Sequence, residues 1–218
     1  MKSEKSEATR LRILTSALEL FHERGFEAAT MRDIATRAGV ATGAAYYYFS
    51  SKDAIVLAFY RRAADEMAPQ LEDVLSGSAD LRKRLAGIIE VKLRYFEPSR
   101  RLLTALAAHV DPLNSLSPFS DQTREIREQD IAVFERAITG TRLRVPEDLK
   151  DSLPRIFWMY QMGVILYWIH DASPSQEKTR ALIEKSLRII VRLLQLSTLP
   201  LMRPLRRQVL DLWGAVSG

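Results

Sequence analysis

Residues 30–52 read TMRDIATRAGVATGAAYYYFSSK, and this stretch decides how the N-terminal part of the chain folds. Thr30 is a good N-cap for a helix, and Asp33 supplies the acidic partner three residues later. Gly39 follows that helix, and glycine readily adopts the left-handed conformation that turns a chain. A very short helix then fits residues 41–48. The stretch therefore predicts two short helices joined by a tight turn.

A longer helix is expected before this pair, from about Ser6 to Arg24, and Gly25 ends it. Three helices with tight glycine-containing joints have the layout of a helix-turn-helix unit. In such a unit a short exposed helix enters the major groove, which is about 12 Å wide, while the preceding helix braces against the backbone. The apolar residues of the first helix recur at spacings of three and four: Leu11, Leu14, Leu18 and Phe21.

The rest of the chain also shows a helical period, and no segment alternates convincingly over strand length. The expected fold class is all-α, with about nine to ten helices. Pro69 predicts a kink or break in the helix that begins near Ser51. Residues 173–176, Ser-Pro-Ser-Gln, read as a helix start with Ser as the N-cap and Gln as its capping-box partner. The basic stretch within residues 200–218 is expected to be a solvated tail, with a lid over the bundle as the alternative.

Composition excludes several classes of protein. The 218 residues include no cysteine, so disulfides and thiolate metal sites are excluded and a reducing cytoplasm is expected. The net charge of +5 permits nucleic-acid binding without proving it. The charged N-terminus does not resemble a secretory signal, and the apolar run at 156–169 is too short for the roughly 20 residues that span a bilayer. The three histidines show no metal-ligand spacing, and no phosphate loop or catalytic constellation appears. No metal, no cofactor and no enzymatic activity are therefore expected.

The stretch at residues 30–52 resembles the tetracycline-repressor (TetR) family of bacterial regulators, and the strong resemblance covers about residues 8–60. It implies a helix-turn-helix DNA-binding domain, residues 1–52, and a helical effector-binding and dimerisation domain, residues 53–218. Beyond the first domain it rests on an all-helical layout of the right length. The matching features are Thr30, Ile34-Ala35, Ala38-Gly39-Val40, Gly43, Tyr46-Tyr47, Phe49 and Ser51-Lys52, with Ile13, Ala17, Leu20, Phe21, Gly25 and Phe26 before them.

The residues expected to contact DNA are hydroxyl, basic or small side chains in this stretch. Hydroxyls and charges suit phosphate oxygens, and small residues let the helix backbone approach the groove floor. The resemblance implies that Lys52 holds a phosphate. Family members often carry basic residues and His where this chain has Thr42 and Tyr48, so its readout is expected to be apolar and shape-based. The predicted contacts are Thr30, Arg32, Thr42, Gly43, Ala44, Tyr46, Tyr47, Tyr48 and Lys52.

The second domain is expected to bind a small apolar effector and to dimerise. Pairing residues 152–196 with their copies would bury two helices that are too apolar for one small domain to cover, and Gly163 permits close helix approach. Aromatic residues at helical spacing equally suit a plain core, and Gln161 among them is either satisfied in the core or a ligand's polar handle. The candidate effector-binding residues are Tyr95, Phe96, His109, Phe134, Trp158, Gln161 and Met162.

These features together predict a homodimeric repressor that a small apolar ligand releases from a pseudo-palindromic operator in the bacterial cytoplasm, where it would be associated with the nucleoid when bound. Two alternatives remain open. One is a ligand carrier or enzyme that keeps the helix-turn-helix without binding DNA. The other is an architectural DNA-binding protein that no small molecule induces.

Overall fold

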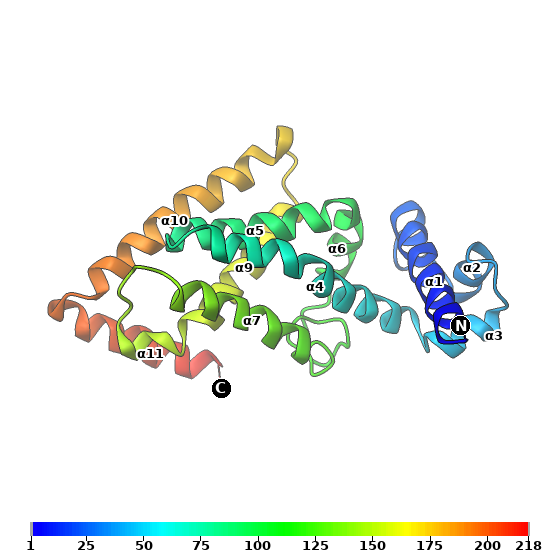
Figure 1. The fold of residues 1–218 in the computed structure, drawn as a ribbon, viewed down its shortest axis with the longest axis horizontal. Helices are drawn as coiled ribbons and strands as arrows, with labels where there is room; N and C mark the ends of the chain where they lie inside the picture. The colour runs from blue at the N-terminus through cyan, green and yellow to red at the C-terminus, as the bar shows by residue number, and fades with distance from the viewer. Residues whose placement is uncertain (1, 218) are drawn as a thin grey trace. The chain divides into compact units, whose positions relative to one another are not determined.

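The computed structural model describes residues 2–217, and these form α-helices and short 3-10 helices without any strand (Figure 1). The all-α prediction is therefore confirmed. Within this range no helix is both long and apolar enough to cross a membrane. The α-helices are α1 (Lys2–Arg24), α2 (Met31–Arg37), α3 (Thr42–Tyr48), α4 (Lys52–Gly77), α5 (Leu81–Phe96), α6 (Arg100–Leu106), α7 (Arg124–Thr139), α8 (Glu147–Lys150), α9 (Leu153–Ile169), α10 (Glu177–Ser197) and α11 (Arg203–Ser217).

The chain divides into two compact units. The first joins the residues up to Glu66 with Tyr95–Arg127, and the second joins Met67–Arg94 with the residues from Glu128 onward. Helices α4, α5 and α7 run from one unit into the other. The two compact units therefore do not divide the chain after residue 52, where the sequence predicts the boundary between the DNA-binding domain and the effector-binding domain.

One hydrophobic core holds the first unit together. Helices α2 and α3 pack beside α1 (Figure 1), and buried side chains such as Phe21 and Ile34 fill the space between them. Leu106 of α6 belongs to the same core. The Arg101 side chain donates to the backbone carbonyl oxygens of His22 and Glu23, at 2.9 and 3.2 Å, at the end of α1. Helix α6 is therefore part of the structure that carries the helix-turn-helix.

The second unit has its own core, in which α9 contributes three of the four buried aromatic side chains in the part of the chain that the structure describes. Trp168 and Phe157 are almost fully buried, and the Phe157 ring stacks against Phe134 of α7 with centroids 6.3 Å apart. At the end of α7 the buried Arg84 guanidinium donates to the carbonyl oxygens of residues 136 and 137. A β-carbon at Gly140 would lie 2.1 Å from that guanidinium, so a larger residue there would displace the Arg84 side chain.

Two features of the helices differ from the expectations. Helix α4 continues through Pro69 to Gly77, so the predicted break does not occur. Pro69 lies on the exposed side, while Met67 and Leu71 are buried and hold the turns on both sides of it in place. The C-terminal segment forms a helix, α11, most of whose residues are exposed, and Arg206 within it pairs with Asp148 at 2.9 Å.

The start of α10 is also built differently from the predicted capping box. Ser175 and Gln176 have positive φ angles of 50° and 56°, so α10 begins only at Glu177. The Gln176 side chain is used elsewhere, since its Oε1 accepts a hydrogen bond of 2.8 Å from Trp168. Ser173 is the N-cap of a 3-10 turn at residues 174–176, as predicted, but no side-chain cap bond is present there and the Ser173 N–H donates to Asp171, so the predicted capping box is wrong.

Asp171 caps α10 instead. Its carboxylate accepts hydrogen bonds from the backbone N–H and the hydroxyl of both Ser173 and Thr179, at 2.6–2.9 Å. These bonds favour the ionised carboxylate and hold the pKa of Asp171 well below its usual range. The junction between α9 and α10 is thus held by one anion that four donors surround.

Asp171→Asn is expected to lower Tm by a few degrees at neutral pH, because an amide nitrogen cannot accept two of these bonds. Because the folded-state pKa is depressed, the stabilisation is fully present above the unfolded value of about 3.9 and is lost as pH falls through the folded value. Thermal unfolding of both proteins from pH 7 to pH 2 checks this, because the Tm difference should hold above about pH 4 and narrow below it. A Tm difference that stays constant down to the lowest pH would contradict it.

Candidate nucleic-acid interface

The N-terminus of α2 is fixed by a capping box between Thr30 and Asp33. The Thr30 Oγ1 accepts from the Asp33 backbone N–H at 3.2 Å, and the Thr30 N–H donates to the Asp33 carboxylate at 3.1 Å. The Thr30 hydroxyl also donates to that carboxylate at 2.6 Å, and these bonds lower the pKa of Asp33. The box predicted from the sequence is confirmed. Because the Thr30 hydroxyl already donates to Asp33, it could donate to a DNA phosphate only after that hydrogen bond is broken.

Helix α2 is tied to α1 through Arg37, and its other arginine, Arg32, is exposed. The Arg37 guanidinium makes two hydrogen bonds of 2.6 Å to the Glu23 carboxylate, which lower the pKa of Glu23. Arg32 is exposed, and no ion pair or hydrogen bond of its side chain occurs within the part of the chain that the structure describes. Arg32 is therefore available to an external anion.

A tight turn leads from α2 to α3. Gly39 has a φ of +65°, a conformation that favours glycine, and the Val40 N–H donates to the Ala35 carbonyl oxygen. Helix α3 then buries Ala45 completely and is followed by the buried Phe49. The small Ala45 lets α3 lie close to the core of the first unit. The opposite face of α3 is exposed to solvent.

That outer face carries Thr42, Gly43, Tyr46 and Tyr47. All four residues are exposed, and the side chain of Tyr47 is among the most accessible large apolar groups of the described chain, at 81%. Ala44 is half-buried beside them. The predicted contacts on α3 therefore share one surface, which combines a glycine, a methyl-bearing hydroxyl and two aromatic rings.

Tyr48 and Lys52 lie differently from the other candidates. Tyr48 is half-buried, accepts a 3.3 Å hydrogen bond from Ser6, and packs edge-on against Tyr47. The Lys52 ammonium donates to the carbonyl oxygens of Phe26 and Glu27, at 2.7 and 3.3 Å, and lies 4.6 Å from the Phe26 ring centre. An ammonium has three donors, so one N–H of Lys52 remains for a phosphate.

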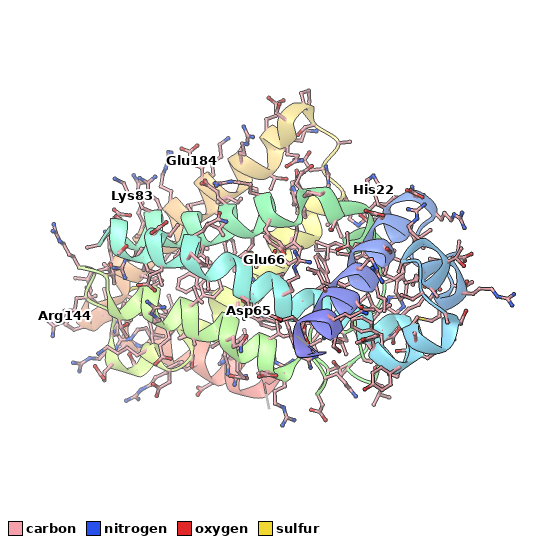
Figure 2. All side chains as sticks on the ribbon, turned by 45° about the vertical axis from the view of Figure 1, so that its right-hand side comes forward. His22, Asp65, Glu66, Lys83, Arg144 and Glu184 are labelled. Carbon is pink, nitrogen blue, oxygen red and sulfur yellow. The ribbon has the colours of Figure 1, made fainter. Side chains whose placement is uncertain are left out.

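Three candidate effector-binding residues lie in the first unit. Tyr95 and Phe96 pack against Phe59, and the Tyr95 hydroxyl donates to Glu66 at 2.6 Å; Figure 2 labels Glu66 on α4. Burial, together with this bond, raises the pKa of Tyr95. His109 follows α6, and its Nδ1 is buried without a hydrogen-bond partner.

The other four candidates lie in the second unit. Phe134, Trp158 and Gln161 are buried, and Met162 is half-buried. A surface hollow of about 700 Å³ lies over residues 163–178, and another of about 600 Å³ lies between residues 77–81 and 141–143. None of these four side chains lines either hollow, so the effector-binding set stays a prediction.

The sequence reasoning missed several polar side chains that the fold brings together. Lys92 is buried and pairs with Asp130 at 2.6 Å, next to Gln161. Lys92 follows Ile88 and Ile89 on the apolar stripe of α5. A charged residue at such a position could have indicated a buried ion pair. Nothing local in the sequence indicates that the Arg101 side chain reaches the end of α1.

Comparisons with known proteins agree with this geometry. A family model described as bacterial regulatory proteins, tetR family, matches residues 13–59, and one described as tetracyclin repressor-like, C-terminal domain, matches residues 84–211. The chain is 27% identical over 147 residues to the HTH-type transcriptional repressor KstR2 of Rhodococcus jostii, covering 65% of this chain and 71% of the relative. It is 30% identical over 143 residues to the HTH-type transcriptional repressor BepR of Brucella suis. This match covers 62% of this chain and 67% of the relative. Among solved structures, the chain is similar to NalD, the secondary repressor of the MexAB-OprM multidrug efflux pump in Pseudomonas aeruginosa. The two are 26% identical with a TM-score of 0.59, and the match covers 85% of this chain and 96% of NalD.

Proposed function

Because the chain belongs to the TetR family and is a DNA-binding transcriptional regulator, we propose that it is a homodimeric repressor released from its operator by a small apolar effector. Two α3 helices, one per protomer, read half-sites of a pseudo-palindrome on one face of the DNA. A multiple of the roughly 34 Å helical repeat separates the half-sites. The protein acts in the cytoplasm, on the nucleoid, and performs no catalysis.

The observation that carries this proposal is the outer face of α3. Gly43, Tyr46 and Tyr47 are exposed on a short helix whose other side is anchored by the fully buried Ala45. A glycine lets the helix backbone approach the groove floor, and the tyrosines supply ring faces for thymine methyls and hydroxyls for phosphates. Thr42, Ala44 and Arg32 extend this surface. Tyr48 and Lys52 border it, and Thr30 supports it by fixing the start of α2.

The partner contact proposed for residues 152–196 rests on the exposed apolar residues of α9 and α10. Met159 and Leu166 on α9 are 41% and 51% exposed, and Ile189 and Leu193 on α10 are 59% and 54% exposed. Gly163 lies on the same stripe of α9 and has open space around its α-carbon. Two helices from each protomer then form a four-helix interface with two-fold symmetry.

Release requires that the effector binds one spacing of the two DNA-binding heads more tightly than the other. Helix α6 belongs to the core of the first unit, and α4 and α5 run from that unit into the second. Rearrangement around an effector in the helical domain is thereby transmitted to α1, α2 and α3.

Selection from random duplexes, followed by sequencing, tests the proposal directly. The expected product is an inverted repeat whose half-sites lie about one helical turn, or a multiple of it, apart. Selection of a single unrepeated site would argue against the dimer. Small-molecule binding without any enrichment of DNA, at any salt concentration, would support the ligand-carrier alternative.

Lys52→Ala is expected to reduce the slope of log affinity against log salt by about one, because each phosphate contact releases roughly one counterion. It should also lower stability by about 1–3 kcal/mol, since the bonds to the carbonyl oxygens of Phe26 and Glu27 are lost. Arg32→Ala should reduce the slope by a similar amount with no loss of stability. Titrations at several salt concentrations and chemical unfolding separate the two effects.

The matched control is Lys83→Ala, an exposed lysine on α5 that Figure 2 labels. It removes the same charge without touching the first unit and should leave the slope unchanged. If Lys83→Ala changed the slope as much as Arg32→Ala, only net charge would matter, and the phosphate contacts would be refuted.

A further inference from the structure

A small polar cluster lies in the apolar interior of the second unit, with one residue from each of three helices. The ammonium of Lys92 on α5 is 2.6 Å from the carboxylate of Asp130 on α7. The Gln161 amide on α9 points its Nε2 at the same carboxylate, at 3.5 Å. Lys92 and Gln161 are only 2% and 1% exposed. Burial of polar groups at this depth is costly unless their hydrogen bonds are completed.

The cluster has one acceptor that nothing in the described chain satisfies. The Oε1 of Gln161 is buried and has no hydrogen-bond partner. Turning the amide over would bring that oxygen against the Asp130 carboxylate, where two acceptors repel each other. The unpaired atom is therefore an acceptor, and it requires a donor.

The cluster also has unused donors. Among the residues that the structure describes, Asp130 is the partner of the Lys92 ammonium, which carries three N–H groups. A buried ammonium with one ion pair retains N–H groups that an acceptor oxygen can use. The cluster thus offers both an acceptor and a donor.

Aromatic side chains flank the cluster on the same helices. Phe157 and Trp158 precede Gln161 by about one turn of α9, and both are buried. Phe134 follows Asp130 by one turn of α7, and its ring stacks on Phe157. These rings are packed against one another, so an apolar molecule admitted by their movement would bring its polar group to Gln161.

We propose that Lys92, Asp130 and Gln161 form the polar end of the effector site and select an apolar effector that carries an uncharged hydroxyl or primary amide. Such a group donates to the Gln161 Oε1 and accepts from Lys92. A carboxylate suits the site poorly, because Asp130 already neutralises Lys92 and a second anion would face both Asp130 and the Gln161 oxygen. An ammonium has no acceptor for the Lys92 N–H groups, so it would satisfy only the Gln161 half of the site. This inference rests on the proposed effector-controlled repressor and defines the chemistry of its ligand.

The test measures binding of four probes with one ten-carbon chain and different head groups: 1-decanol, decanamide, decanoate and decylammonium. The two neutral probes are used below their solubility limits and the two ions below their critical micelle concentrations. Calorimetric titration of the full-length protein should show at least tenfold tighter binding of the alcohol and the amide than of the two ions. In Gln161→Leu the preference should fall by about tenfold, since the acceptor is gone. Gln129→Leu, at an exposed glutamine of α7, is the matched control and should keep the preference.

The proposal is overturned if the wild-type protein binds all four probes alike or binds none of them. It is also overturned if Gln161→Leu keeps the preference with an unchanged Tm, and in either case the cluster is a hydrated part of the core. Operator binding is measured on the same preparations without probe. Normal operator binding together with a failed probe series leaves the repressor intact and removes only the effector class, whereas absent operator binding refutes the proposed function itself.

Discussion

Replacing both Ile189 and Leu193 with glutamate is expected to convert the protein into a monomer and to lower its operator affinity by about 10²–10⁴-fold. The expected loss is the avidity gained when the second half-site is bound by a head already tethered to the first. The two side chains are one helical turn apart on α10, and each has more than half of its surface exposed, 59% and 54%. In an interface between copies the two carboxylates would be desolvated against apolar partners. On a free surface they would simply be solvated.

Sedimentation of the purified variant and gel-shift titrations on a full operator and a half-site measure the two effects separately. The variant should bind both DNAs with the same low affinity, whereas the wild-type protein should strongly prefer the full operator. The matched control places two glutamates at Val110 and Leu113, which are 58% and 93% exposed in the loop after α6. A dimeric Ile189→Glu/Leu193→Glu protein would mean that α10 faces solvent, and the interface would have to be sought elsewhere.

Local patterns predicted the helix-turn-helix well because its determinants are local. The Thr30–Asp33 box spans three residues, and Gly39 with its positive φ comes directly after α2. Helix α1 ends at Arg24 as predicted but begins at Lys2, four residues before its expected start, whereas α3 begins within one residue of its expected start. Caps and glycine turns act through backbone geometry, which neighbouring residues fix.

The same kind of pattern failed at the start of α10, where residues just before the four-residue pattern take its hydrogen bonds. The sequence from Ser173 to Gln176 has the spacing of a capping box, but Trp168 takes the Gln176 oxygen and Asp171 takes over the cap. The break predicted at Pro69 is also absent, and buried residues on both sides of it hold α4 as one continuous helix. Tertiary packing overrides a local signal when it satisfies more groups than the local arrangement does.

The candidate sites also divide into features that a local sequence pattern predicts and features that depend on the fold. Because Ala45 is buried, the helical period places Tyr46 and Tyr47 on the exposed side of α3, and the sequence pattern can predict this. The pairing of Lys92 with Asp130 joins two helices that are far apart in the chain, and no short-range pattern specifies it. A lysine on an apolar stripe indicates that some partner exists, while the identity of that partner comes only from the fold.

Gly43→Glu is expected to abolish operator binding, with a loss of about 100-fold or more, while leaving the protein as stable as the wild type or slightly more stable. Gly43 is the second residue of α3, its φ is outside the left-handed range, and a β-carbon built there would meet no atom within 4 Å. Replacing a helical glycine removes a cost of roughly 0.5–1 kcal/mol, and an acidic residue in the first turn is favoured by the helix dipole. In the groove the same carboxylate would meet phosphates and base edges that it repels, at a cost of several kcal/mol.

The opposite signs of these two effects make the variant informative, because a folding defect cannot imitate them. Thermal unfolding and operator titration of one preparation measure both, with Gly77→Glu at the end of α4 as the control for an added glutamate, since its surroundings are equally open. Gly43→Ala should raise Tm and retain most of the affinity, because a methyl group adds little bulk and no charge. If Gly43→Glu bound the operator as tightly as the wild type, the outer face of α3 would lie outside the major groove, and Tyr46 and Tyr47 would lose their assignment with it.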